Sequence, residues 1–130
     1  MSCVAGVVID TSVWIDALAG AKIQSVVDAL ADGSAIMPPL VIAELVTGAE
    51  TMATRQAIGE FLQEAEVHET PLGHWIDVGD LRRSLARKGV NVTVPDAHVA
   101  QCALDLDAVL LARDTIFAEI AKHAPLRLGR

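Results

Sequence analysis

The sequence is poor in aromatic residues and in cysteine, and both shortages limit what the protein can be. Aromatic side chains make up 3% of the 130 residues and tyrosine is absent, so the core has to be built from Ala, Val, Leu and Ile. So few aromatic residues argue against a surface that binds single-stranded nucleic acid mainly by stacking on its bases. The two cysteines, Cys3 and Cys102, give neither a disulfide framework nor a zinc-type spacing. We interpret them as buried thiols in a reducing cytoplasm.

A targeting signal and a long apolar segment are also missing. The first apolar run stops at Asp10 and has no basic start, so it is too short and wrongly flanked for a signal peptide or a membrane span. Apolar residues make up 52% of the chain, which is enough for one core at this length. We therefore predict a single domain over residues 1–130, in a cytoplasmic protein with no membrane partner.

Basic residues are not in excess, because the formal net charge is -7. A simple phosphate-binding protein is expected to be basic, so this charge alone argues against a nucleic-acid partner. The objection weakens if several carboxylates bind divalent cations, since bound cations reverse the local field. The arrangement of the acidic residues therefore has to decide.

Short apolar runs alternate with stretches of helical periodicity along the chain. Strands alternating with helices are typical of a parallel sheet that is covered on both sides, which predicts an α/β fold. We expect strands at residues 4–9, 35–37, 67–69, 108–112 and 126–128. We expect helices at about residues 12–20, 23–33, 38–46, 52–65, 75–88, 95–106 and 116–123, the first of them capped by Thr11 or Ser12.

Four acidic residues stand where ordinary surface charges are unusual. Asp10 and Asp114 follow the two clearest strands, and such folds bind ligands at the carboxyl ends of their strands. Glu44 is the one polar residue between positions 37 and 46. A helix that is apolar all round is buried, so we expect a buried carboxylate there that needs a partner. Asp96 lies in the first turn of a predicted helix, on a face that points toward the core.

Convergence of the four carboxylates would require a cation, because like charges a few ångströms apart cannot all ionise without one. Hard oxygen ligands favour Mg²⁺ or Mn²⁺. Each residue also has an ordinary explanation: Asp10 and Asp114 as turn residues, Asp96 as a stabiliser of a helix start, and Glu44 as the partner of a buried arginine. The case for a site is the combination of four acids without an obvious basic partner for each.

Four segments carry a resemblance that covers essentially the whole chain. They are Asp-Thr-Ser-Val-Trp-Ile-Asp at 10–16, Ala-Glu-Leu at 43–45, Pro-Asp-Ala at 95–97 and Ala-Arg-Asp-Thr-Ile-Phe at 112–117. In this order the segments resemble the PIN-domain nucleases, and most closely the VapC-type toxins of bacterial toxin–antitoxin pairs. The resemblance implies a three-layer α/β/α sandwich with a central, mainly parallel sheet. It also implies a pocket that binds Mg²⁺ or Mn²⁺ through Asp10, Glu44, Asp96 and Asp114.

The same resemblance implies a function and partners. The expected activity is endonucleolytic cleavage of RNA, by hydrolysis of phosphodiester bonds, which inhibits translation. The expected partners are a VapB-type antitoxin, whose tail enters the active-site groove, and a second copy of the chain in a homodimer. Ser12 matches a hydroxyl that supports the site, although a helix-cap role would explain it equally well. Arg113 lies beside the pocket and is a candidate to neutralise a phosphate, with a surface ion pair as the alternative.

Two positions depart from the family pattern. Ile116 stands where many relatives carry a further acid, so we expect no fifth ligand there. His98 stands where a small or aliphatic residue is usual. We expect a satisfied helix histidine, rather than one that touches RNA or titrates near the site. A basic cluster consists of Arg82, Arg83, Arg87 and Lys88. We interpret it as a solvated helix face, with a patch that steers RNA as the alternative.

Three other functions remain as alternatives. A magnesium-dependent phosphatase of the haloacid dehalogenase kind would need a second Asp two residues after the nucleophile, where this chain has Ser12. A receiver-like signalling domain normally has a Lys after a late strand, where this chain has Arg113 and Asp114. A relative that binds RNA or protein without cleaving is opposed by acids at all four positions.

Overall fold

The computed structural model describes residues 6–129, in which each strand is separated from the next by one or two helices. The strands are β1 (Val7–Ile9), β2 (Ala35–Met37), β3 (Glu66–Val67), β4 (Val109–Leu111) and β5 (Arg127–Leu128). The helices are α1 (Thr11–Leu18), α2 (Gln24–Asp32), α3 (Pro39–Thr47), α4 (Met52–Glu64), α5 (Leu72–Arg87), α6 (Val94–Asp105) and α7 (Ile116–Ala121).

The described strands form one parallel sheet in the order β3-β2-β1-β4-β5. β1 is central: Val8 pairs with Ile36 of β2 on one side and with Leu110 of β4 on the other. The chain runs outward from β1 through β2 to β3, and then returns to β4 on the opposite side. The strand order therefore reverses between β1 and β4, and ligands bind at this switch point in folds of this type.

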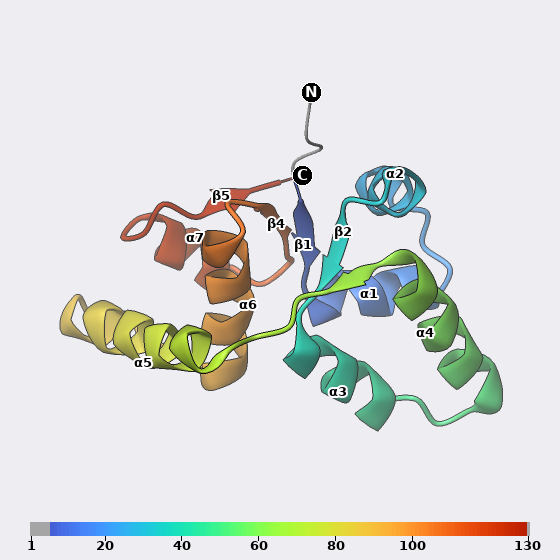
Figure 1. Ribbon diagram of the computed structural model, residues 1–130, viewed down its shortest axis with the longest axis horizontal. Helices are drawn as coiled ribbons and strands as arrows, with labels where there is room; N and C mark the ends of the chain where they lie inside the picture. Colours follow the sequence, from blue (N-terminus) through green and yellow to red (C-terminus); the bar gives the residue numbers. More distant parts are fainter. Residues whose placement is uncertain (1–5, 130) are drawn as a thin grey trace.

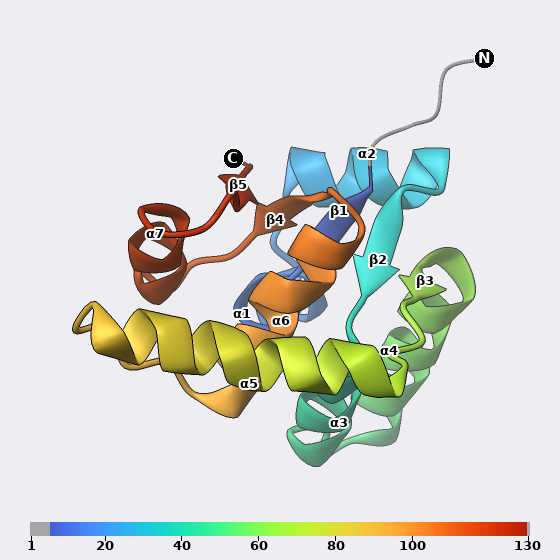
Figure 2. The same ribbon diagram turned by 60° about the vertical axis from the view of Figure 1, so that its left-hand side comes forward.

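Helices cover both faces of the sheet. Figure 1 shows α5, α6 and α7 on one side and α1, α2 and α4 on the other. Figure 2 shows α6 lying across β1 and β4, with α5 packed over it. The predicted α/β/α sandwich is confirmed, and the described sheet is parallel throughout.

The core consists mostly of small and medium aliphatic side chains, as the shortage of aromatics requires. The strands β1, β2 and β4 are largely buried, whereas the two-residue edge strands β3 and β5 are exposed. Trp14 of α1 packs against Phe61 of α4 with ring centroids 4.9 Å apart. This contact joins two helices on the same side of the sheet.

Several element boundaries differ from the sequence-based expectation. Asp10, and not Thr11 or Ser12, is the N-cap residue of α1. α5 begins at Leu72, three residues earlier than predicted, because Pro71 stands at its N-cap and proline suits a helix start. β3 lies at Glu66–Val67 instead of 67–69. The predicted first two residues of β1, at 4–5, lie outside the described residues, as does Cys3.

No helix within residues 6–129 combines the length and the apolar character that crossing a membrane requires.

Candidate active site at the carboxyl edge of the sheet

Asp10 lies at the junction of β1 and α1, in the middle of the carboxyl edge of the sheet. Its N–H donates to the carbonyl of Leu111 in β4 at 2.9 Å, and its own carbonyl accepts from the N–H of Val13 at 3.1 Å. These bonds hold the backbone from the strand side and from the helix side. The residue is only 8% exposed, so the position of its carboxylate is well defined.

Asp114 follows β4 at the same edge, because β1 and β4 are parallel neighbours. Its Oδ1 accepts from the N–H of Ile116 at 3.0 Å, and its carbonyl accepts from the N–H of Phe117 at 3.3 Å. The residue therefore shapes the turn that leads into α7. It is exposed, which leaves the carboxylate open to a ligand.

Asp96 lies in the first turn of α6, where the N-cap residue Thr93 accepts its N–H at 3.3 Å. Burial is the largest influence on its carboxyl group and raises the pKa, and a hydrogen bond from Thr93 opposes this. The charges of Asp10, Asp114 and Glu44 each raise the pKa of Asp96 further. The charges of Asp10, Asp114 and Glu44 thus act on Asp96, although the four residues lie far apart along the chain.

Glu44 is exposed, so the prediction of a buried carboxylate is wrong. In α3 the buried residues are Val41 and Leu45, while Glu44 and the apolar Val46 lie at the surface. A helix with apolar residues all round is therefore covered on one side only here, and the cost of burying a charge does not arise. Glu44 is still positioned, since its Oε1 accepts a hydrogen bond from Thr11 Oγ1 at 2.9 Å.

Ser12 links the ends of the two central strands. Its Oγ donates to Asp10 Oδ2 at 2.9 Å and accepts from the N–H of Arg113 at 3.4 Å. It makes no helix-cap hydrogen bond, because the N-cap of α1 is Asp10. Arg113 Nε donates to Asp16 Oδ2 at 3.1 Å in an ion pair whose side chains are 58% and 45% exposed. The surface ion pair expected as the alternative for Arg113 is thus present.

The chemistry of the donor set fits a hard divalent cation. The donors from Asp10, Glu44, Asp96 and Asp114 are all carboxylate oxygens, which Mg²⁺ and Mn²⁺ prefer. The three acids that raise the pKa of Asp96 repel it, and a cation between them would remove that repulsion.

Comparison with known proteins identifies the family of the chain. A family model for the PIN domain matches residues 7–123. The chain belongs to the PIN domain family. Members of this family are generally nucleases, and the resemblance noted in the sequence is confirmed. No curated protein matches the chain.

Solved structures share the fold of this PIN domain over almost its whole length. The VapBC complex from Salmonella typhimurium, bound to DNA, matches with a TM-score of 0.79 at 20% identity, covering 97% of this chain and 98% of that one. VapBC2 from Rickettsia felis, bound to a promoter DNA fragment, matches with a TM-score of 0.77 at 20% identity, covering 95% of this chain and 96% of that one. VapBC-1 from nontypeable Haemophilus influenzae matches with a TM-score of 0.75 at 18% identity, covering 95% of this chain and 96% of that one.

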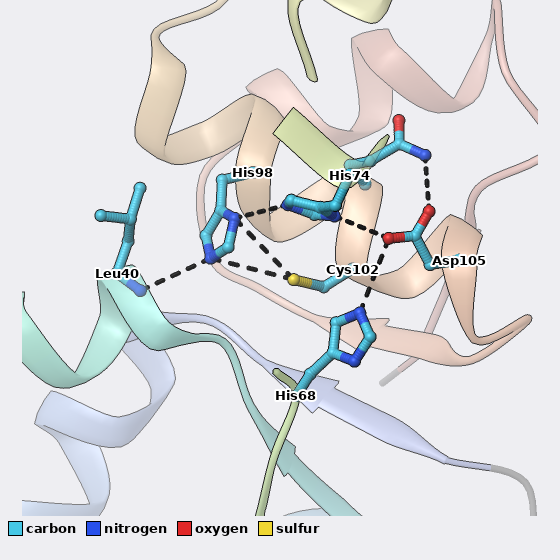
Figure 3. A network of polar contacts seen from close by, with 7 residues as sticks. Leu40, His68, His74, His98, Cys102 and Asp105 are labelled. Carbon is cyan, nitrogen blue, oxygen red and sulfur yellow. Dashed lines mark hydrogen bonds and ion pairs between the residues drawn. The ribbon is translucent and has the colours of Figure 1, made fainter. Parts of the chain in front are cut away.

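His98 is a fully buried histidine of α6, as expected, and it belongs to a network that the sequence analysis missed (Figure 3). Its Nδ1 lies 2.8 Å from Nε2 of His74, whose Nδ1 lies 2.6 Å from Oδ2 of Asp105. Burial first, and then the nearby His74 and His68, lower the pKa of His98 to about 4. The missed signal was the spacing of His98, Cys102 and Asp105, four and three residues apart on one face of a helix.

The basic cluster on the second half of this domain is exposed. Its residues lie at the end of α5, and Arg82 Nε donates to the carbonyl of Val92 at 2.8 Å. The exposure matches the expected solvated helix face, and one arginine, Arg82, is held against the loop before α6. The basic cluster consists of Arg82, Arg83, Arg87 and Lys88.

Proposed function

We propose that this PIN domain protein is a Mg²⁺- or Mn²⁺-dependent endoribonuclease that acts as the toxin of a VapBC-type toxin–antitoxin pair. In this role it hydrolyses RNA phosphodiester bonds and thereby inhibits translation. The observation that carries the proposal is the placement of Asp10 and Asp114 after the neighbouring parallel strands β1 and β4, where both charges act on Asp96. Acids placed at the switch point of a parallel sheet suit the binding of divalent cations and phosphate.

The proposed metal ligands are Asp10, Glu44, Asp96 and Asp114. A bound Mg²⁺ supplies a contact for phosphate oxygens, lowers the pKa of a water molecule and neutralises charge that builds up at phosphorus. The role of the surrounding residues is to position the carboxylates. Ser12 Oγ and Thr11 Oγ1 hold Asp10 and Glu44 by hydrogen bonds of 2.9 Å each.

The remaining acids are candidates for a second role at the same site. Asp96 or Asp114 is proposed to orient the attacking water through a hydrogen bond. Arg113 lies next to Asp114 in sequence, and its exposed guanidinium is proposed to meet an RNA phosphate by exchanging its partner Asp16.

A cleavage assay with purified protein tests the nuclease proposal. A fluorescently labelled RNA should be cut with Mg²⁺ or Mn²⁺, and cutting should stop with EDTA. Asp10→Asn should reduce the rate at least about 100-fold, the loss typical of removing one group that stabilises developing charge. Asp28→Asn changes an exposed acid of α2 and is the matched control. RNA that is bound but left intact under all these conditions would identify a non-cleaving binding protein and contradict the proposal.

The partner proposals follow from fold similarity to VapBC complexes. We propose a VapB-type antitoxin as the cognate partner, a homodimer as the toxin assembly, residues 1–130 as one domain and the cytoplasm as the site of action. Co-expression with the product of a short upstream reading frame should restore growth of cells that express this chain. Light scattering during size-exclusion chromatography should give the mass of a dimer. A partner that binds without suppressing RNA cleavage would contradict the antitoxin assignment.

A further inference from the structure

A second cluster of ligand-type side chains lies between the end of β3, the start of α5 and the end of α6. We call it the thiol–imidazole cluster: His68, His74 and Cys102, together with Asp105, which contacts both histidines (Figure 3). One ligand atom from each of His68, His74 and Cys102 lies within 4.8 Å of the other two. Asp105 Oδ2 lies 2.6 Å from His74 Nδ1 and 3.6 Å from His68 Nε2. Two imidazoles and a thiol thus lie close together, and a carboxylate contacts both imidazoles.

The cluster is largely closed to solvent, and one of its polar atoms has no partner. Cys102 is fully buried, and the side chains of His74, His68 and Asp105 are 1%, 16% and 22% exposed. Nε2 of His68 is buried without a hydrogen-bond partner among the described residues, because the 3.6 Å to Asp105 is too long for a hydrogen bond. Buried polar atoms are normally satisfied, so an unpartnered nitrogen aimed into a ligand cluster needs an explanation.

We propose that the thiol–imidazole cluster is a Zn²⁺ site with His68 Nε2, His74 Nδ1, Cys102 Sγ and the Asp105 carboxylate as its ligands. Zn²⁺ prefers four ligands drawn from imidazole, thiolate and carboxylate groups, whereas Mg²⁺ and Ca²⁺ prefer oxygen alone. Figure 3 shows the Asp105 carboxylate linked to both His68 and His74, and the sulfur of Cys102 next to His98. Bonds of about 2.0–2.3 Å would draw the donors closer together, and they would give His68 Nε2 the partner it lacks.

Charge balance also fits a divalent cation. One thiolate and one carboxylate carry two negative charges, and two neutral imidazoles add none, so the zinc-bound cluster is electrically neutral. Neutrality matters because an uncompensated charge at a buried position is costly. The proton of the Cys102 thiol leaves when the metal binds, as it does at thiolate zinc sites generally.

His98 provides the outer shell that zinc-bound histidines usually have. With His74 Nδ1 on the metal, the N–H at His74 Nε2 donates to His98 Nδ1 at the observed 2.8 Å. The N–H of His98 then lies on Nε2, which is 3.8 Å from Cys102 Sγ. Trp75 stacks on His98 with centroids 4.7 Å apart and planes 2° apart, and this fixes the ring. The competing contact, from the N–H of Leu40 to His98 Nε2, is long at 3.4 Å.

A surface pocket includes one of the proposed ligands. A pocket of about 460 Å³ is lined by His68 itself together with the acidic residues Glu66 and Glu69. The proposed site is separate from the acidic one: Asp96 and Asp105 lie nine residues apart on α6, about 14 Å along a helix axis. Zinc would therefore tie β3, α5 and α6 together and steady the helix that carries Asp96. The zinc proposal does not depend on the nuclease proposal.

Metal titration of the chelator-treated full chain tests the site. The same titration is repeated with the Asp10→Asn variant, which weakens metal binding at the acidic site and should not change the amount of Zn²⁺ bound. We expect one Zn²⁺ per chain by elemental analysis, and an excess of Mg²⁺ should not displace it. Co²⁺ should give the strong visible bands of a tetrahedral complex and a thiolate-to-metal charge-transfer band. Trp75, stacked on His98, should change its fluorescence on binding.

Ligand variants decide whether these four residues are responsible. Cys102→Ala should abolish the charge-transfer band. Cys102→Ala and His68→Gln should each weaken Zn²⁺ binding more than about 100-fold, and His98→Gln about 10- to 100-fold, the range for outer-shell partners.

The controls are the other cysteine and an exposed histidine, Cys3→Ser and His123→Gln, which should bind as the parent does. Because Cys102 is buried, Cys102→Ala is open to a folding defect, and His68→Gln at a less buried position keeps the test decisive. Zinc binding that survives both Cys102→Ala and His68→Gln, or a parent chain that binds no zinc, would overturn the proposal.

Discussion

Ser12 Oγ donates a hydrogen bond of 2.9 Å to Oδ2 of Asp10, two residues before it in the chain. Since Asp10 ends β1 and the same hydroxyl accepts from the backbone of Arg113 after β4, one side chain connects both central strand ends. This bond occupies one oxygen of Asp10 and leaves the other for a cation. Ser12 thus acts on the proposed metal site through Asp10.

Replacing Ser12 by Ala should weaken the response to metal without unfolding the protein. A hydrogen bond to a charged group is worth about 1.5–3 kcal/mol, so the Mg²⁺ concentration for half-maximal RNA cleavage should rise about tenfold or more. Ser12→Thr keeps the hydroxyl and should stay close to the parent. The measurement is the cleavage rate as a function of Mg²⁺ concentration, with circular dichroism as the check on folding. Equal Mg²⁺ dependence in Ser12→Ala and the parent would exclude this positioning role.

Glu44→Gln should lower the pKa of Asp96. Burial is the largest cause of the raised pKa of Asp96, and the charge of Glu44 raises it further, so removal of that charge lets Asp96 ionise at lower pH. Carboxyl carbon NMR of Asp96 in metal-free protein measures the shift directly. Glu60→Gln, at an exposed position on α4, is the control and should leave the titration unchanged. The same Glu44 variant should require more Mg²⁺ for cleavage, and this separates the ligand role from the electrostatic one.

The sequence was sufficient to predict the sheet and its parallel character, and it is the source of the proposal for the four acids. Apolar runs that end in Asp10 and Asp114 carry this information locally, because a strand end and its following residue need no distant partner to be recognised. The burial of Glu44 was predicted wrongly because it depends on the packing around α3, which is not a local property. Apolar neighbours in a helix do not tell how many sides are covered, and here Val46 is 36% exposed.

The thiol–imidazole cluster could be predicted only in part. Cys102 and Asp105 share a face of α6, so half of the cluster is visible as helical spacing. His68 follows β3 and His74 lies in α5, and their approach depends on how α5 packs across α6. That packing is a tertiary property that no local pattern in a single sequence encodes.

Gly33→Ala and Gly59→Ala should have opposite effects on stability. Gly33 ends α2 with φ at +77°, in the left-handed region, whereas Gly59 lies inside α4 with open space around it. Alanine is strained at the first position and is the better helix former at the second, by about 1 kcal/mol. Urea unfolding should show a lower midpoint for Gly33→Ala and a higher one for Gly59→Ala. Destabilisation of similar size in both would show that helix propensity is not what distinguishes these sites.

The metal-free protein should lose stability between pH 6.5 and about pH 4 because of His98. Burial, with contributions from His74 and His68 and against the effect of Asp105, lowers the pKa of His98 from 6.5 to about 4. In that window the unfolded chain binds a proton at His98 that the folded chain excludes, so stability falls as the pH falls and levels off below the folded pKa. The shift corresponds to a loss of roughly 3 kcal/mol. Urea unfolding in EDTA at several pH values measures it, and His98→Gln should flatten the dependence, while His123→Gln should not. An unchanged slope in His98→Gln would assign the proton uptake to another group.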